Sequence, residues 1–304
     1  MAALPVSPDD ALISEAVAAA ENSDVVVAVV GDRIELVGET KSTATLDLFG
    51  DQIALLEALA ATGKPMIVVL IASKPHVLPK SVQEAAAILW AGNPGMVGGQ
   101  AIAEILLGKI EPSGRLPISF AVHVGQQPTY YNQIKGQHGT RYADLTQQPA
   151  FAFGQGLSYT TVEYSNLEVL TPELSSAGVT PAGYAVNTTE EQYQEIAAGN
   201  VPADHLHARV TLRNTGSRPV VETVQAYLRD VVFSVTWANR ELKGYRQVEL
   251  APGEQKVVDL VLPVSAMTLV NARGERIIEP GEFQILVGPD SREESLLVGP
   301  FTVS

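Results

Sequence analysis

The sequence contains no cysteine and has no excess of basic residues, and each shortage excludes a class of protein. Without cysteine, the chain can form neither disulfides nor thiolate metal sites. Its formal net charge is −14, with 20 lysines and arginines against 34 aspartates and glutamates. This balance argues against nucleic-acid binding, because a protein that reads a phosphate backbone needs a basic stripe. Neutral or cationic partners fit the charge better.

Long apolar runs are also absent from the sequence. No apolar stretch approaches the roughly 20 residues that cross a membrane, so we expect no membrane span. The first 21 residues lack the basic region and apolar core that mark a secretion signal. They predict a helix instead, with Ser7 as its N-cap and Pro8 at its first position. The composition, 46% apolar and 18% charged over 304 residues, indicates a globular protein of about two domains.

Residues 1–120 alternate apolar strands with helices. After the first helix we expect strands at 25–30, 66–72 and 86–90, and helices at 51–62, 81–85 and 98–107. Continuous apolar strands between helices are typical of a parallel sheet that is covered on both faces. The pattern predicts a partial α/β three-layer sandwich with a mostly parallel sheet. We call it partial because such sheets usually have more strands, and because a helix rather than a strand comes first, so that the sheet looks truncated at its N-terminal side.

The remainder of the chain has a different pattern. Residues 121–158 are polar and rich in glutamine at their centre, Pro128 and Pro149 break any long helix, and the pattern predicts an extended connector. Residues 159–304 contain short alternating runs separated by turn signals, and these predict an all-β sandwich of the fibronectin type III kind. The expected strands are 162–170, 207–213, 222–229, 241–250, 256–262, 283–287 and 297–303. An insertion at 171–206 holds a short helix, for which Thr188 and Glu191 would frame a capping box.

The loop after strand 25–30 is unusually long. Roughly twenty residues join that strand to helix 51–62, where about 2 to 6 are usual, and a loop of this length is commonly functional. In parallel α/β sheets, ligands bind outside the carboxyl ends of the strands. Glu39, in the segment GETKSTATLDL, is therefore a candidate general acid. Asp32 ends the strand, and we expect it to cap or orient the loop.

Several longer strings carry a resemblance to a known family. The strings are GKPMIVVLIASKP at 63–75, LWAGNPGMVGGQAIAEILLGKIEPSGRLPISF at 89–120, FAFGQGLSYT at 151–160 and, in the β part, VTLRNTGSRPVVETVQAYLRD, RELKGYRQVELAPGEQK and EPGEFQILVG. With them, the whole chain resembles the C-terminal portion of a glycoside hydrolase family 3 enzyme of the β-glucosidase or exo-β-glucanase kind. In that family a (β/α)8 barrel comes first, an α/β sandwich second and a fibronectin type III-like domain third. The resemblance implies that the chain holds most of the second domain and all of the third.

The resemblance also implies an activity and a catalytic residue. It implies a retaining, exo-acting β-glycosidase that hydrolyses terminal β-linked glucosyl residues of oligosaccharides with two carboxyl groups. Glu39 matches the acid/base position, and Glu35 is a weaker candidate because the length of this loop varies in the family. The nucleophile is an aspartate of the barrel, which takes about 200 residues or more and is absent here. The isolated chain is therefore expected to be incomplete and inactive.

Other polar residues have smaller expected roles. Lys41 could contact a sugar hydroxyl or steady the Glu39 carboxylate, and His138 could reach the substrate. His76 is expected to be structural.

Neither the residues nor the resemblance implies a cofactor. No grouping of His, Asp and Glu has metal-ligand spacing, and no phosphate-binding glycine loop follows a strand, so no metal site is expected.

Three questions stay open at this point. The scaffold would also suit a non-catalytic carbohydrate-binding or interaction subunit that works with a separate barrel chain. The sugar could be xylose or another β-linked sugar instead of glucose, because barrel residues set most of that preference in the family. Localisation is unknown, although a periplasmic or secreted bacterial location is favoured for the full-length enzyme.

Overall fold

The computed structural model describes residues 9–134, 142–182 and 188–304, and these residues form two compact units. The described part of the first unit comprises residues 9–110, 119–129 and 148–151. The described part of the second comprises residues 111–118, 130–134, 142–147, 152–182 and 188–304. The chain therefore crosses from one unit to the other repeatedly between residues 110 and 152. The domain boundaries expected from the sequence, at residues 120 and 158, remain predictions.

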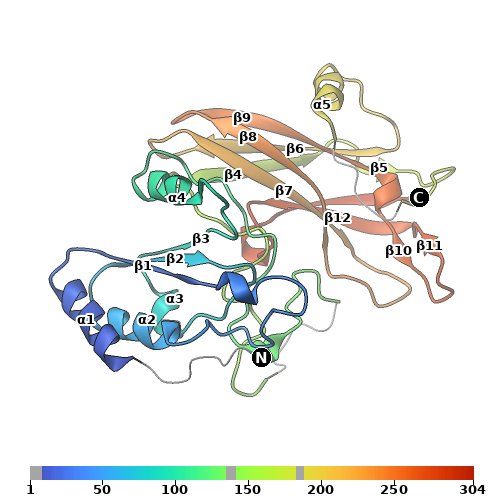
Figure 1. The fold of residues 1–304 in the computed structure, drawn as a ribbon. Helices are drawn as coiled ribbons and strands as arrows, with labels where there is room; N and C mark the ends of the chain where they lie inside the picture. Colours follow the sequence, from blue (N-terminus) through green and yellow to red (C-terminus); the bar gives the residue numbers. More distant parts are fainter. Residues whose placement is uncertain (1–8, 135–141, 183–187) are drawn as a thin grey trace. The chain divides into compact units, whose positions relative to one another are not determined.

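The first unit is built on a parallel sheet with the strand order β1-β2-β3 (Figure 1). The strands are β1 (Val26–Gly31), β2 (Met66–Ile71) and β3 (Ala87–Trp90). The helices are α1 (Asp10–Glu21), α2 (Gln52–Ala61), α3 (Lys80–Gln83) and α4 (Gly98–Leu106), with 3-10 turns η1 (Ile34–Leu36) and η2 (Val124–Gln126). In Figure 1, α1, α2 and α3 lie on one side of the sheet and α4 lies on the other. The unit thus has three layers, with the buried strand β2 at its centre.

One face of the edge strand β1 is exposed. Val27 and Val29 on this strand, and Val25 just before it, expose 49%, 61% and 48% of their surfaces. Ala28 and Val30, whose side chains point to the opposite face, are buried. Because parallel sheets are normally covered on both faces, this stripe of valines is apolar surface that would ordinarily be packed.

We expect the valine stripe to bind an environment-sensitive apolar dye, because contiguous exposed apolar patches attract such probes. Replacing Val25, Val27 and Val29 together by threonine should lower the dye fluorescence of the 304-residue chain. A matched control carries the same substitution at three exposed valines of the second unit, Val232, Val257 and Val298. Equal fluorescence of the two triple variants would contradict the prediction.

The start of α1 differs from the expectation. Ser7 and Pro8 lie outside the described residues, and the N-cap is Asp9, whose side chain accepts a hydrogen bond from the Leu12 amide at 3.2 Å. The prediction of Ser7 as the cap was therefore wrong. Aspartate is as good an N-cap as serine, and it satisfies one of the free amides of the first turn.

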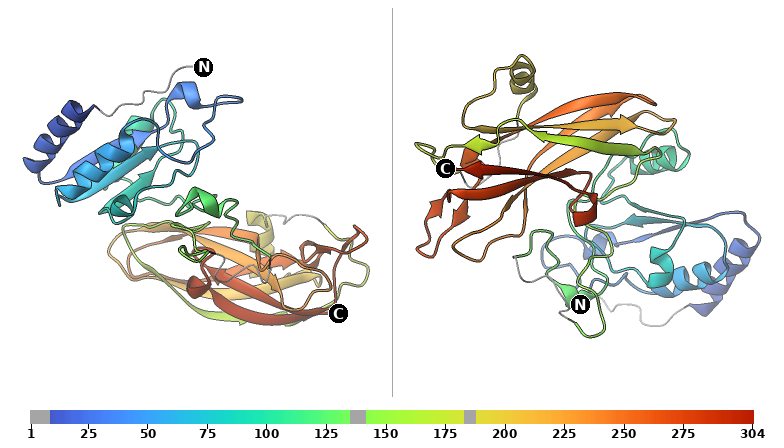
Figure 2. Two further views of the ribbon diagram at one scale, coloured as in Figure 1. Left: turned by 90° about the horizontal axis from the view of Figure 1, so that it is seen from below. Right: turned by 180° about the vertical axis from the view of Figure 1, so that it is seen from behind.

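The second unit is a β-sandwich (Figure 1; Figure 2). One sheet has the order β5-β13-β12-β7-β8 and the other the order β4-β6-β9. The strands are β4 (Val162–Val169), β5 (Glu173–Leu174), β6 (His205–Asn214), β7 (Val220–Asp230), β8 (Glu241–Leu250), β9 (Gln255–Pro263), β12 (Gly281–Gly288) and β13 (Leu297–Val303). The pair β10 (Leu269–Val270) and β11 (Arg276–Ile277) and the 3-10 turns η3 (Val264–Ala266) and η4 (Glu293–Ser295) complete it. Residues such as Leu206, Leu212, Leu260 and Ile285 form its buried core.

The insertion between β5 and β6 contains the predicted short helix, α5 (Glu190–Ala197), one residue later than expected. Its capping box is formed by Thr189 and Gln192 instead of Thr188 and Glu191. The Thr188 hydroxyl donates to the Val261 carbonyl at 3.1 Å, which holds this residue against β9. The Thr189 hydroxyl accepts from the Gln192 amide at 3.2 Å and caps the helix.

A buried ion pair ties residues 111–118 to the sandwich. Arg115 Nη2 donates to Glu222 Oε2 at 2.8 Å, and the Tyr164 hydroxyl donates to Glu222 Oε1 at 2.8 Å. The side chains of Arg115 and Glu222 expose only 9% and 5%. Burial raises the pKa of the Glu222 carboxyl above its ordinary value, although the charge of Arg115 and the hydrogen bond from Tyr164 act in the opposite direction. Arg115 therefore stabilises the ionised form of this buried carboxyl group.

These features confirm the expected fold class, an α/β unit with a parallel sheet together with a fibronectin type III-like β-sandwich. Every strand expected from the sequence overlaps a strand of the structure. In the part of the chain that the structure describes, the helices are too short or too polar to cross a membrane.

Candidate active site

The long loop after β1 carries Glu39 in a tight turn. Apart from η1, the loop contains no helix or strand between the end of β1 and the start of α2. The Lys41 amide donates to the Gly38 carbonyl at 3.2 Å, which closes a four-residue turn with Glu39 at its second position. Thr40, at the third position, has a φ of 65°. A β-branched residue rarely adopts this left-handed conformation, and strained backbone of this kind concentrates at functional sites.

The Glu39 side chain is exposed and has no internal partner. Among the described residues, no hydrogen bond or ion pair involves its carboxylate oxygens. Lys41 is also exposed, and its ammonium group likewise contacts no acceptor in the described part of the chain. The turn therefore presents a carboxylate that can form new contacts without breaking old ones.

Glu35, the other glutamate of the loop, is paired with Arg33. Both of its side-chain oxygens accept hydrogen bonds from Arg33 at 3.3 Å. A hydrogen bond from its own backbone amide and the contact with Arg33 lower the pKa of Glu35 below its ordinary value. A lowered pKa makes a carboxyl group a poorer proton donor at neutral pH.

Asp32, at the end of β1, connects the loop to the residues that follow β2. One carboxylate oxygen accepts hydrogen bonds from the Ser73 amide and hydroxyl, both at 2.9 Å. The other lies 2.8 Å from His76 Nε2, and His76 Nδ1 lies 2.9 Å from the Leu46 carbonyl. Burial alone would raise the pKa of Asp32, but these hydrogen bonds outweigh it and hold the pKa below its ordinary value. Asp32 is therefore an ionised anchor at the start of the loop.

Lys74 holds a later part of the same loop. Its ammonium group donates to the Thr43 carbonyl at 3.0 Å, to the Thr43 hydroxyl and to the Thr45 carbonyl at 2.9 Å. An ammonium group has three protons, so these acceptors use all of its donors.

Gln52, the first residue of α2, joins both ends of the loop. Its side-chain amide accepts from the Gly31 amide at 2.7 Å and donates to the carbonyls of Gly31 at 2.9 Å and Phe49 at 2.8 Å. Gly31 has a φ of 148°, and a Cβ at this position would lie 1.8 Å from the Ile71 carbonyl oxygen. Only glycine fits this approach of β1 to β2.

The structure thus brings four of the candidate residues together on one loop. Asp32, Glu35, Glu39 and Lys41 lie on one loop, whereas His138 lies outside the described residues. Sequence reasoning did not identify Lys74 and Gln52. A signal for Lys74 existed, because it follows the carboxyl end of β2, at the same edge of the sheet as the loop. No group of three or more potential metal ligands gathers anywhere in the described ranges.

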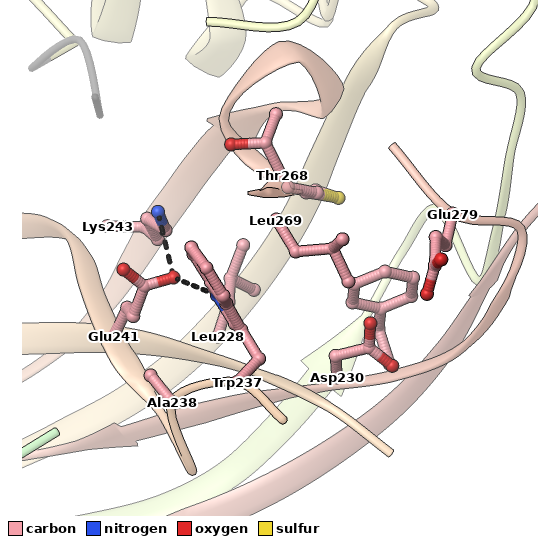
Figure 3. Close-up of a pocket in the computed structure, with 11 residues that line it drawn as sticks. Leu228, Asp230, Trp237, Ala238, Glu241, Lys243, Thr268, Leu269 and Glu279 are labelled. Atoms are coloured by element: carbon pink, nitrogen blue, oxygen red, sulfur yellow. Dashed lines mark hydrogen bonds and ion pairs between the residues drawn. The ribbon is translucent and has the colours of Figure 1, made fainter. Parts of the chain in front are cut away.

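A small cavity of about 20 Å³ lies in the second unit (Figure 3). Trp237, Glu241 and Lys243 are among its lining residues. Trp237 Nε1 donates to a Glu241 oxygen at 3.2 Å, and Lys243 pairs with the same oxygen at 3.3 Å, as the dashed lines in Figure 3 show. A cavity of this size has room for about one water molecule, so it cannot enclose a sugar ring.

Comparison with known proteins identifies the family of both units. The glycosyl hydrolase family 3 C-terminal domain matches residues 6–159, and the fibronectin type III-like domain matches residues 222–291. The periplasmic β-glucosidase of Salmonella typhimurium is 36% identical over 297 residues, which are 94% of this chain and 35% of that protein. A β-xylosidase of Formosa agariphila is 36% identical over 296 residues, which are 95% of this chain and 37% of that protein.

A solved structure of a β-glucosidase is also similar to this chain. A β-glucosidase involved in saponin metabolism from intestinal bacteria has 52% sequence identity and a TM-score of 0.84, and the match covers 97% of this chain and 39% of that protein. The chain therefore spans between 35% and 39% of the length of the three relatives named here. Because both domains match, the chain belongs to glycoside hydrolase family 3 and carries the family's C-terminal α/β domain and its fibronectin type III-like domain.

Proposed function

We propose that this chain is the C-terminal part of a retaining, exo-acting β-glycosidase and that Glu39 is its acid/base residue. In this proposal, the nucleophile is an aspartate on a (β/α)8 barrel, within the part of the relatives that the chain does not span. The substrates are terminal β-linked glucosyl residues of oligosaccharides or simple glucosides. The names of the relatives support this substrate class, since they are β-glucosidases and a β-xylosidase.

The observation that carries the proposal is the contrast between the two glutamates of the loop. Glu35 is paired with Arg33 and its pKa is lowered, whereas Glu39 lies in an exposed turn and its carboxylate makes no contact among the described residues. A general acid must reach the glycosidic oxygen, and a carboxylate without internal partners is free to do so. The position of the loop, after the carboxyl end of β1, is where ligands bind in parallel α/β sheets.

The chemistry assigned to Glu39 has two steps. In the first step, its carboxyl group protonates the departing glycosidic oxygen while the nucleophile attacks the anomeric carbon from the opposite face. In the second step, its carboxylate removes a proton from the water that hydrolyses the glycosyl-enzyme. A retaining mechanism requires the two carboxyl groups to lie about 5 to 5.5 Å apart, so substrate must bind between this loop and the barrel.

The proposal extends to specificity and location. The Salmonella relative is named as periplasmic, which favours a periplasmic location for the complete enzyme. Because one relative is named a β-xylosidase, xylosides also belong to the proposed substrate class. Lys41, two positions after Glu39, is proposed to contact a sugar hydroxyl, because its ammonium group has no acceptor among the described residues.

We expect the purified 304-residue chain to release no 4-nitrophenol from 4-nitrophenyl β-glucoside, because the nucleophile is missing. The same chain joined to the barrel-containing part of the 52% identical β-glucosidase should be active. We call this fusion the joined enzyme. Activity of the isolated chain that disappears in Glu39→Gln would mean that the chain supplies its own nucleophile. An inactive joined enzyme, together with glucoside binding by the isolated chain in calorimetry, would favour a non-catalytic binding subunit.

A further inference from the structure

The loop that carries Glu39 needs external support to hold a catalytic group. It runs from Asp32 to Asp51, and its only regular element is the short turn η1. A loop of this length has many accessible conformations, and fixing one of them costs conformational entropy. Catalysis tolerates little of this freedom, since a displacement of about 1 Å can cost about 10²-fold in rate.

Two side chains from the segment after β2 supply such support. Lys74 binds Thr43 and Thr45, which lie four and six residues after Glu39. His76 bridges Asp32 at the start of the loop and Leu46 near its end. We call Lys74 and His76 together the β2 clamp.

The clamp is itself rigidly held. His76 exposes 2% of its surface, and both of its ring nitrogens face oxygen acceptors, the Asp32 carboxylate and the Leu46 carbonyl. These two contacts hold the imidazole ring between the start and the end of the loop. The clamp also follows directly from β2, which is paired on both sides and largely buried. Lys74 and His76 therefore extend from the central strand of the sheet, which is hydrogen-bonded to a neighbour on each side.

The clamp binds the loop on both sides of Glu39 and leaves the Glu39 carboxylate itself free. Its contacts are made to Asp32 before the turn and to Thr43, Thr45 and Leu46 after it. None of these contacts uses the side chain of a candidate proton donor. This arrangement is typical of a site in which one set of residues orients the side chain that reacts.

We propose that Lys74 and His76 are positioning residues that fix the Glu39 loop in its catalytic conformation. This inference rests on the proposed role of Glu39 as the acid/base residue. The first test is structural and does not depend on that role. In the 304-residue chain, Lys74→Met should increase amide hydrogen exchange in residues 33–50 and leave exchange in β2 unchanged. Lys80→Met, which removes an exposed lysine from the same segment, should change neither.

The second test uses the leaving-group dependence of the joined enzyme. Alkyl β-glucosides need protonation of the leaving oxygen, whereas 2,4-dinitrophenyl β-glucoside does not. Lys74→Met should therefore lower kcat/KM for the alkyl glucoside by about 10- to 100-fold and change kcat/KM for the dinitrophenyl glucoside little. Lys74→Arg, which keeps a charged donor, should restore part of the loss. A residue with a merely structural role would affect both substrates equally.

The results for Glu39→Gln and Lys74→Met distinguish the proposed role of Glu39 from the proposed role of the clamp. If Glu39→Gln shows the leaving-group dependence and Lys74→Met does not, the clamp does not position Glu39 and the inference is overturned. If Glu39→Gln shows no such dependence, the proposed function fails, and hydrogen exchange alone decides whether Lys74 orders the loop. Because His76 is buried, His76→Asn is measured as a second variant only after its circular dichroism matches that of the unsubstituted chain. Unchanged exchange in residues 33–50 of both variants overturns the inference.

Discussion

Replacing Glu39 by glutamine is expected to slow the hydrolysis of alkyl β-glucosides by the joined enzyme by about 10²- to 10⁴-fold, the usual contribution of a general acid. Glutamine preserves the shape of the side chain and cannot transfer a proton. The second step should also slow, because water then lacks its general base. Azide attacks the glycosyl-enzyme without a base, so it should restore kcat for 2,4-dinitrophenyl β-glucoside and yield a β-glucosyl azide.

The matched control is Glu35→Gln on the same loop. Glu35 is bound to Arg33, and its pKa is lowered, so this variant should retain most of its activity. A large loss in Glu35→Gln, together with azide rescue, would transfer the acid/base assignment from Glu39 to Glu35. Normal activity of both variants would show that neither carboxylate reacts. The measurement is kcat and kcat/KM for both substrates with and without azide.

Replacing Arg115 by methionine is expected to lower the free energy of unfolding by about 3–5 kcal/mol, the typical cost of removing one partner of a buried ion pair. The variant leaves Glu222 buried, with the Tyr164 hydroxyl as its remaining side-chain partner. Denaturant unfolding followed by circular dichroism measures the change. Arg273→Met is the control, because Arg273 and Glu275 form a 2.9 Å pair that is largely exposed. This control should leave the free energy of unfolding nearly unchanged.

The loss in Arg115→Met should depend on pH. The folded-state pKa of Glu222 is already raised, so the folded state binds this proton more tightly than the unfolded state does. Ionisation of Glu222 therefore costs stability as pH rises through that range, and without Arg115 the cost grows. We expect a larger difference from the unsubstituted chain at about pH 8 than at about pH 5. The double variant Arg115→Met, Glu222→Gln should regain stability at the higher pH. An equal loss at both pH values would mean that packing, and not charge, is responsible.

The long elements of both units follow from local sequence patterns. The apolar strand β2 and the alternating strands of the sandwich agree with the expected ranges to within two residues at each end. The two-residue strands β5, β10 and β11 were not predicted, because two residues carry no periodicity and pairing depends on distant partners such as Thr302 opposite Glu173. Both helix caps were misplaced for one physical reason. Another residue able to cap lay within two positions, and only tertiary contacts decide between them.

The site was predictable only in part. The end of a strand and the length of the following loop are visible in the sequence, and they pointed to Asp32 and Glu39. The supports of the loop are not visible in this way, because Lys74 and Gln52 bind backbone atoms that lie up to 31 residues away. Their role depends on the path of the loop backbone, and no side-chain pattern encodes that path.

The repeated crossing of the chain between the two units limits how such a protein can be recombined. A single cut near residue 120 would leave Arg115 on one fragment and its partner Glu222 on the other. Exchange of the fibronectin type III-like unit between relatives must therefore transfer residues 111–118 as well as the later strands. A sandwich that is replaced from residue 152 onward inherits a foreign connecting segment, and that segment must place a basic side chain at the position of Arg115 to neutralise the buried glutamate. No single breakpoint between residues 110 and 152 leaves each unit with all of its own segments, because residues 119–129 and 148–151 belong to the first unit, so gene fusion or domain shuffling in this family should transfer the two units together.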